Sequence, residues 1–158
     1  MKRIIDILRF TFISPEFAWA LGLAVLLYIY PSPLVMIGKK IGANDEVWKW
    51  LPTLPLVFAG VTFRLSSKIR APFDKGNKQL YDWYYFNRIT DRLYASYILV
   101  LMSVISTISI WIFSDDCPPS IVGLVFLGSV GVSGCVAFEI YLASQKIREV
   151  LEQHGDQF

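Results

Sequence analysis

The chain has very few histidines and cysteines, the side chains on which many catalytic and metal sites depend. It contains one histidine, His154, and two cysteines among 158 residues. We find no metal-ligand spacing, no phosphate-binding glycine loop and no dinucleotide fingerprint. Two cysteines do not build a disulfide framework. Ser133 stands in a Gly-Val-Ser-Gly sequence, but no apolar stretch contains a histidine that could serve as its general base. The sequence therefore predicts a protein that is not an enzyme and has no catalytic residue, metal or cofactor.

Long apolar stretches make up most of what the sequence does contain, since 54% of its residues are hydrophobic. The stretches are 17–37, 47–63, 95–113 and 121–143. A helix needs about 20 mainly apolar residues to cross roughly 30 Å of hydrocarbon. The last two stretches meet this length, and the first meets it if Pro31 and Pro33 lie inside it or at its outer end. These lengths predict an all-α integral membrane protein with four transmembrane helices in a single domain, 1–158.

The stretch at 47–63 is the least regular of the four. It is short and carries Pro52 and Pro55. Pro52 can stand in the first turn of a full span, where its missing N–H costs little. Alternatively, the prolines break the helix into a re-entrant element that lines a cavity. The sequence leaves both alternatives open.

Basic residues are very unevenly divided among the segments that separate these stretches. Of fifteen Lys and Arg residues, twelve lie before 17, within 64–94 or within 144–158, and none lies between 113 and 121. An excess of Lys and Arg marks the cytoplasmic side of a membrane protein. We therefore expect a multi-pass protein of the cell inner membrane, with both termini and the 64–94 loop in the cytoplasm. Residues 1–13 are expected to form an amphipathic interfacial helix, and 144–158 a cytoplasmic tail that extends the last helix.

A stripe of hydroxyl side chains follows the third stretch. Its members fall within about 40° of one another on a helical wheel and are Ser96, Ser103, Thr107 and Ser114. In one interpretation, the hydroxyls bond to backbone carbonyls or to a neighbouring helix. In the other, the stripe lines a water-filled pore. The four residues are candidate pore-lining residues.

The fourth stretch carries small residues and one acid. Gly128, Gly131 and Cys135 share a face that would let another helix approach closely, so they are candidates for packing in an oligomer. Glu139 is the only carboxylate inside a predicted span, and intramembrane acids are functional candidates by default. Its simplest role is an ion pair with Arg64, Lys68 or the tail. The alternative is a cation-attracting ring in an assembly.

Aromatic and basic residues crowd the end of the 64–94 loop. The candidates for ligand binding there are Lys75, Lys78, Tyr81, Trp83, Tyr84, Tyr85, Arg88 and Arg92. One interpretation is an interfacial aromatic belt with cations that reach the headgroups. The other is a stacking platform with phosphate-binding cations, the chemistry that recognises nucleotides and single-stranded nucleic acids.

Together these features favour a homo-oligomeric ion channel of three or more subunits in the lipid bilayer, gated from the cytoplasm. The hydroxyl stripe, the Tyr81–Phe86 aromatics and the lack of catalytic residues resemble those of small four-span effectors of bacterial antiphage defence systems. That resemblance implies a channel that disrupts the membrane in response to a nucleotide, a nucleic acid or a partner enzyme. The alternative is a non-enzymatic accessory subunit that anchors a partner protein through its cytoplasmic loop.

Overall fold

The computed structural model describes residues 14–70, 86–113 and 117–155, and these segments are helical, without a β-strand. The helices are α2 (Pro15–Ile29), α3 (Ser32–Gly42), α4 (Asp45–Trp50), α5 (Thr53–Arg70), α7 (Phe86–Ile112) and α8 (Pro119–Gly155). The predicted helix over 1–13 lies outside these residues, and so do 71–85 and Ser114. The all-α prediction is confirmed for the part of the chain that the structure describes.

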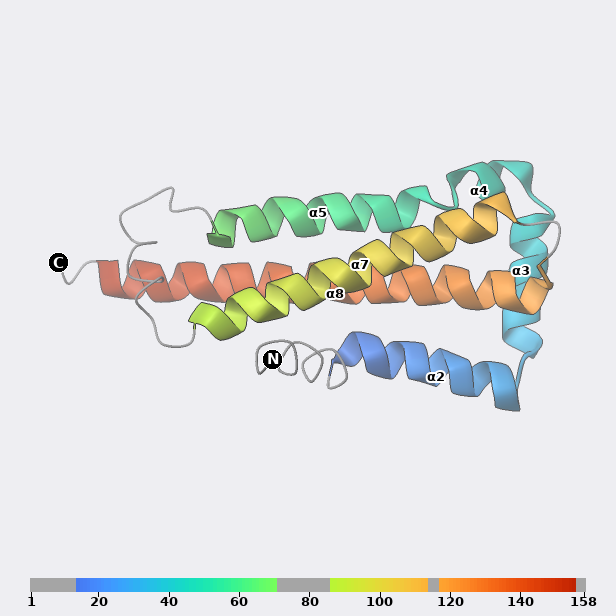
Figure 1. The fold of residues 1–158 in the computed structure, drawn as a ribbon, viewed down its shortest axis with the longest axis horizontal. Coiled ribbons are helices and arrows are strands. Elements are labelled where there is room, and N and C mark those ends of the chain that lie inside the picture. Colours follow the sequence, from blue (N-terminus) through green and yellow to red (C-terminus); the bar gives the residue numbers. More distant parts are fainter. Residues whose placement is uncertain (1–13, 71–85, 114–116, 156–158) are drawn as a thin grey trace.

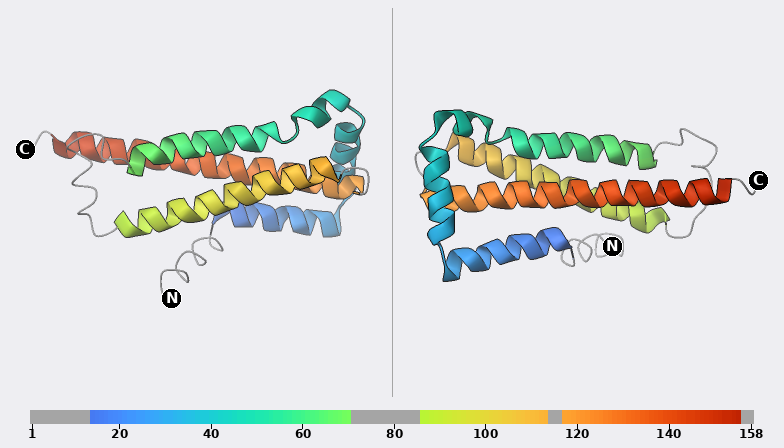
Figure 2. Two further views of the ribbon diagram at one scale, coloured as in Figure 1. Left: turned by 45° about the horizontal axis from the view of Figure 1, so that its top comes forward. Right: turned by 180° about the vertical axis from the view of Figure 1, so that it is seen from behind.

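Four helices run lengthwise and one runs across them. α2, α5, α7 and α8 follow the long axis of the molecule, whereas α3 lies across one end (Figure 1). The two further views show the same arrangement (Figure 2). α8 is the central helix, because α2, α3, α5 and α7 all pack against it. We call the end that α3 crosses the α3 end, and the opposite end, where α7 begins, the Arg92 end.

The structure divides the predicted span over 17–37 into two helices. α2 ends at Ile29, α3 begins at Ser32, and their axes meet at 100°. Pro31 has no N–H to continue the helical ladder, and the residue before a proline is displaced from helical backbone angles. Tyr30 accordingly has φ −144° and ψ 76°. The prolines therefore turn the chain sideways instead of lying within a continuous span.

Two glycines allow α3 to cross α8 at very short range. A Cβ atom at Gly38 would lie 1.8 Å from the Pro119 carbonyl oxygen, and one at Gly123 would lie 2.2 Å from that of Leu34. Both distances are far below any real Cβ contact. The crossing angle is therefore fixed by backbone packed on backbone, which only glycine at these positions permits.

The helices that follow extend beyond the predicted boundaries. Pro52 directly precedes α5 and Pro55 lies in its first turn, so neither proline interrupts the helix over Thr53–Arg70. α5 continues to Arg70 and α7 already begins at Phe86, so both ends of the predicted 64–94 loop are helical. As predicted, α8 continues without interruption into the tail, as far as Gly155.

Two helices are long and apolar enough to cross a membrane within the described residues, over Arg88–Ile112 and Pro119–Glu149. A third is added if α2 and α3 are counted as one broken span, because only together are they long and apolar enough. α5 does not meet the test, and its sequence ends in three cations within seven residues, Arg64 to Arg70. The molecule is therefore a helical bundle suited to a membrane, as the composition predicts.

Candidate functional site

Three charged side chains meet at the Arg92 end of the bundle. The Arg92 Nη2 atom on α7 donates to Glu16 Oε2 on α2 at 3.1 Å and to Glu139 Oε2 on α8 at 2.6 Å. The Glu16 side chain is fully buried, whereas those of Arg92 and Glu139 are 26% and 31% exposed. One guanidinium thus joins three helices. We call Glu16, Arg92 and Glu139 the ion-pair cluster.

The start of α2 places Glu16 in this cluster. The Ser14 hydroxyl accepts a hydrogen bond from the Phe17 N–H at 3.2 Å, and Pro15 occupies the first turn. This is an N-cap followed by a first-turn proline, as the Ser-Pro-Glu sequence predicts. The cap fixes the first turn of α2, and this positions the Glu16 carboxylate opposite Arg92.

The ion pair predicted for Glu139 exists, but its partner is not the predicted one. Arg64, Lys68 or the tail was expected to supply the cation, whereas the structure pairs Glu139 with Arg92. Arg92 was itself expected to bind a ligand phosphate, yet its guanidinium contacts two carboxylates. As an acid in the first turn of its helix, Glu16 is predicted from the sequence only to interact with the dipole of that helix. The cluster is therefore a site that the sequence interpretation missed, although Arg92 and Glu139 are among its candidate residues.

Exposed aromatic side chains mark the level of the opposite end. At the α3 end, α2 finishes with Tyr28 and Tyr30, α4 carries Trp50 and α7 finishes with Trp111, all of them exposed. Tyr and Trp are enriched where a bilayer meets water. Trp111 follows Arg92 by 19 residues on α7, a separation of about 28 Å along the helix. That separation is close to the roughly 30 Å thickness of bilayer hydrocarbon.

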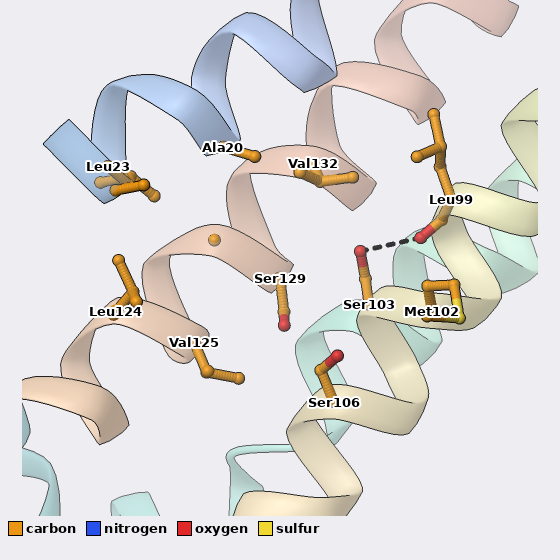
Figure 3. A pocket seen from close by; sticks show the side chains of 12 residues that line it. Ala20, Leu23, Leu99, Met102, Ser103, Ser106, Leu124, Val125, Ser129 and Val132 are labelled. Atoms are coloured by element: carbon orange, nitrogen blue, oxygen red, sulfur yellow. Dashed lines mark hydrogen bonds between the residues drawn. The ribbon is translucent and has the colours of Figure 1, made fainter. Parts of the chain in front are cut away.

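A groove of about 300 Å³ lies between α2, α7 and α8, on the side of the cluster that faces the α3 end. α8 forms its floor, because α2 and α7 both pack on α8 and have few contacts with each other. Figure 3 shows Ala20 and Leu23 of α2 facing Ser103 and Leu99 of α7 across α8. The ion-pair cluster and the groove thus belong to the same three helices.

The predicted hydroxyl stripe faces the interior of this one chain. Ser96, Ser103 and Thr107 are 1%, 7% and 0% exposed. The Ser103 hydroxyl donates to the Leu99 carbonyl at 3.0 Å, and that of Thr107 to the Ser103 carbonyl at 2.8 Å. Ser103 also lines the groove. These bonds correspond to the packing interpretation of the stripe. Ser114 lies outside the described residues.

The small residues of α8 make close contacts within the chain. A Cβ at Gly131 would lie 1.9 Å from Trp19 Nε1, so the indole of Trp19 rests on this glycine. Gly128 faces Leu23 at an ordinary distance and lines the groove. Cys135 is a free, partly buried thiol one turn before Glu139. Gly128 and Gly131, which were predicted to pack between subunits, therefore serve the docking of α2 in the structure of one chain.

The contact between Trp19 and α8 gives a first prediction. The indole Nε1 donates to the Leu127 carbonyl at 3.2 Å, and phenylalanine cannot make this bond. We expect Trp19→Phe to lower the free energy of unfolding by about 1 kcal/mol, the usual net value of such a hydrogen bond. Thermal unfolding in detergent, followed by circular dichroism, measures the change. Trp50→Phe, at an exposed position of α4, is the control, and equal losses in both variants would contradict the prediction.

The remaining ligand-binding candidates are Lys75, Lys78, Tyr81, Trp83, Tyr84 and Tyr85, which lie outside the described residues. Arg88 is exposed on α7, one turn before Arg92. In the described segments, no group of three or more His, Cys, Asp or Glu side chains could hold a metal ion. The Ser133 hydroxyl donates to the Ser129 carbonyl at 2.6 Å, so it is bound to its own helix.

No protein-family model matches the chain, and no curated protein or solved structure is significantly similar to it. The function is therefore inferred from its residues and their geometry.

Proposed function

We propose that the protein is a non-enzymatic ion channel of the cell inner membrane, assembled from several copies of the chain and opened from the cytoplasm. The observation that carries the proposal is that one set of three helices bears both the groove and the ion-pair cluster. In the proposed orientation, the groove lies within the membrane and the cluster lies at one of its boundaries. The groove, as the proposed ion path, and the ion-pair cluster, as its proposed gate, thus lie along the same three helices of each protomer, α2, α7 and α8.

The proposed channel has four spans, formed by α2, α5, α7 and α8. α5 is the helix whose composition argues least for a span, yet its ends reach both levels of the bundle. Leu51, just before α5, packs with Ile110 and Val122 at the α3 end. Ile69 of α5 packs with Leu93 and Ile140 near the Arg92 end. The exposed Arg64 lies one to two turns from the Arg92 end, so its long side chain can reach the headgroups.

The serines of the groove suit a route for cations. The Ser103 hydroxyl donates its hydrogen bond to the Leu99 carbonyl, which leaves its own oxygen lone pairs available to water or a cation. Ser106 and Ser129 line the same groove. We therefore propose a channel that conducts cations in preference to anions.

The ion-pair cluster is proposed to hold the channel closed. α2 and α7 have few contacts with each other, so the bonds from Arg92 to Glu16 are a main link between them. When this link is released, α2 can move away from α7 and the groove can widen. With the positive-inside orientation, the cluster faces the cytoplasm, where a ligand or partner would act. The protein would then serve as an effector that disrupts the membrane.

Cation flux from liposomes tests the proposal. Wild type and Glu16→Gln are reconstituted, and Glu16→Gln, which weakens the link to α2, is expected to release K⁺ faster. In that background, Ser103→Leu should slow the release by about tenfold, which corresponds to a barrier raised by about 1.4 kcal/mol. Ser109→Leu, on the exposed side of the same helix, is the matched control. The absence of flux in every variant, with a monomeric mass in native mass spectrometry, would refute the channel.

The second candidate is an accessory subunit that anchors a partner protein. It is favoured by the hydroxyls of Ser103, Thr107 and Ser133, which all bond to their own helix, as packing requires. Over-expression separates the two functions, because a channel depolarises cells and arrests their growth, whereas an anchor alone is harmless. Ser103→Leu relieves the arrest only if the groove conducts.

A further inference from the structure

In the closed state, the groove between α2, α7 and α8 is lined mainly by apolar side chains. None of its twelve lining residues is ionisable, and nine are Ala, Leu, Met, Val or Gly. The Ser103 hydroxyl already donates to the Leu99 carbonyl, so it demands no partner from an occupant. An uncharged, mainly apolar lining is complementary to a hydrocarbon and repels a charged headgroup or peptide.

The position of the groove along the bundle indicates which hydrocarbon can fill it. Leu99 and Ser103 follow Arg92 by 7 and 11 residues, which places them about 10 and 16 Å from the ion-pair cluster. The groove therefore lies between the two boundaries of the bilayer, near its middle. At this depth the surrounding medium consists of lipid chains and not of water or headgroups.

The groove is also continuous with the surface that faces the lipid. Met102 and Ala24 line it and are exposed, and they stand beside Ile98 and Val25, which are exposed as well. Figure 3 shows Met102 and Leu23 on opposite sides of the gap between α7 and α2. The acyl chain of a lipid can enter the groove sideways through this gap without leaving the hydrocarbon of the bilayer.

The geometry points to an acyl chain of a bilayer phospholipid as the resident occupant of this groove. A lipid acyl chain in the groove would make dispersion contacts with the apolar side chains that line it, among them Leu99 and Met102. The site is thus a lipid-tail site between three helices of one protomer. The apolar lining indicates that the occupant is a hydrocarbon, and the depth of the groove indicates that this hydrocarbon belongs to a lipid.

This inference deepens the proposed function and rests on it for one consequence. A lipid chain that fills the groove blocks the route that Ser103 lines, so the closed state is a lipid-filled state. Opening then requires the chain to leave when α2 moves away from α7. Binding of the lipid is measured without any flux, so the two proposals fail separately.

The test uses a phosphatidylcholine with a diazirine in the middle of one acyl chain. The full-length protein is reconstituted in vesicles that contain this lipid, illuminated and digested. Labelling is expected to concentrate on the peptide stretches that line the groove, around 99–103 and 124–132. Native mass spectrometry of the protein released from gentle detergent should show a retained phospholipid.

Two variants make the test specific to the groove. Gly128→Leu places a branched side chain in the groove and is expected to reduce retained lipid and labelling at 99–103 by about tenfold. Gly60→Leu is the matched control, because a Cβ added there meets no atom within 4 Å. Ala24→Leu narrows the entrance and repeats the test if Gly128→Leu does not fold.

Labelling that is uniform along the outer faces of α2 and α7 would overturn the inference. So would equal lipid retention in wild type and Gly128→Leu, or a lipid-free dimer in which a second copy covers the groove. Lipid retention without K⁺ flux in any variant would refute the channel and leave the lipid site standing. K⁺ flux without retained lipid would refute the lipid site and leave the channel proposal standing.

Discussion

Replacing Arg92 with methionine is expected to lower the free energy of unfolding by about 3 kcal/mol, the largest change we foresee for a single side chain. Breaking a buried ion pair by removing one partner costs about 3–5 kcal/mol, because the other charge stays behind uncompensated. Here two carboxylates lose their cation, and Glu16 is fully buried. We take the lower end of the range because Arg92 and Glu139 are 26% and 31% exposed. Reversible unfolding with sodium dodecyl sulfate, followed by tryptophan fluorescence, measures the loss.

Two controls separate the lost charge from the lost side chain. Lys146→Met breaks the exposed pair with Glu149, whose atoms are 3.3 Å apart, and should change stability by no more than about 0.5 kcal/mol. Combining Arg92→Met with Glu16→Gln and Glu139→Gln removes all three charges and should restore most of the stability. If the triple variant were no more stable than Arg92→Met, lost packing and not unpaired charge would explain the effect.

Gly38→Ala is expected to destabilise the fold by about 1–3 kcal/mol, since overpacking a tight contact costs this much. The added methyl carbon would lie 1.8 Å from the Pro119 carbonyl oxygen, which belongs to rigid backbone. α3 must therefore lift away from α8, and the packing at Gly123 is lost with it. The loss is measured as a lowered midpoint of thermal unfolding.

Gly42→Ala, four residues later on α3, is the matched variant. A Cβ there meets no atom within 4 Å, so the higher helix propensity of alanine should leave the protein equally stable or raise its stability by up to about 1 kcal/mol. Opposite signs for two identical substitutions on one helix would establish the crossing of α3 and α8. Equal effects would show that α3 does not lie where the structure places it.

The partner of Glu139 could have been found from the sequence. The Asp-Asp-Cys-Pro-Pro turn predicts an antiparallel hairpin between the third and fourth stretches. Arg92 lies 24 residues before Asp116 and Glu139 lies 23 residues after it, so the hairpin brings both to the same depth. The contribution of Glu16 was not accessible in this way, because nothing local states that α2 packs on the far side of the same hairpin.

The break of the first stretch and the burial of the stripe show two different limits. Pro31 and Pro33 signal an interruption, but a sequence does not state whether a proline kinks a helix or turns the chain by 100°. A helical wheel shows that Ser96, Ser103 and Thr107 share a face. It does not show whether that face contacts α8 of the same chain or the axis of an assembly, since hydroxyl side chains are found both in helix–helix contacts and in water-filled pores.

The 100° turn after α2 has a consequence for the surrounding membrane. α2 has 15 residues and is thus about 22 Å long, whereas bilayer hydrocarbon is about 30 Å thick. Beyond Ile29 the chain runs sideways as α3, with Lys39 and Lys40 exposed, so no further apolar length is available in that direction. In the proposed four-span layout, lipids beside α2 must shorten or tilt their chains. The protein would then thin the bilayer on one flank and favour membranes built from shorter lipids.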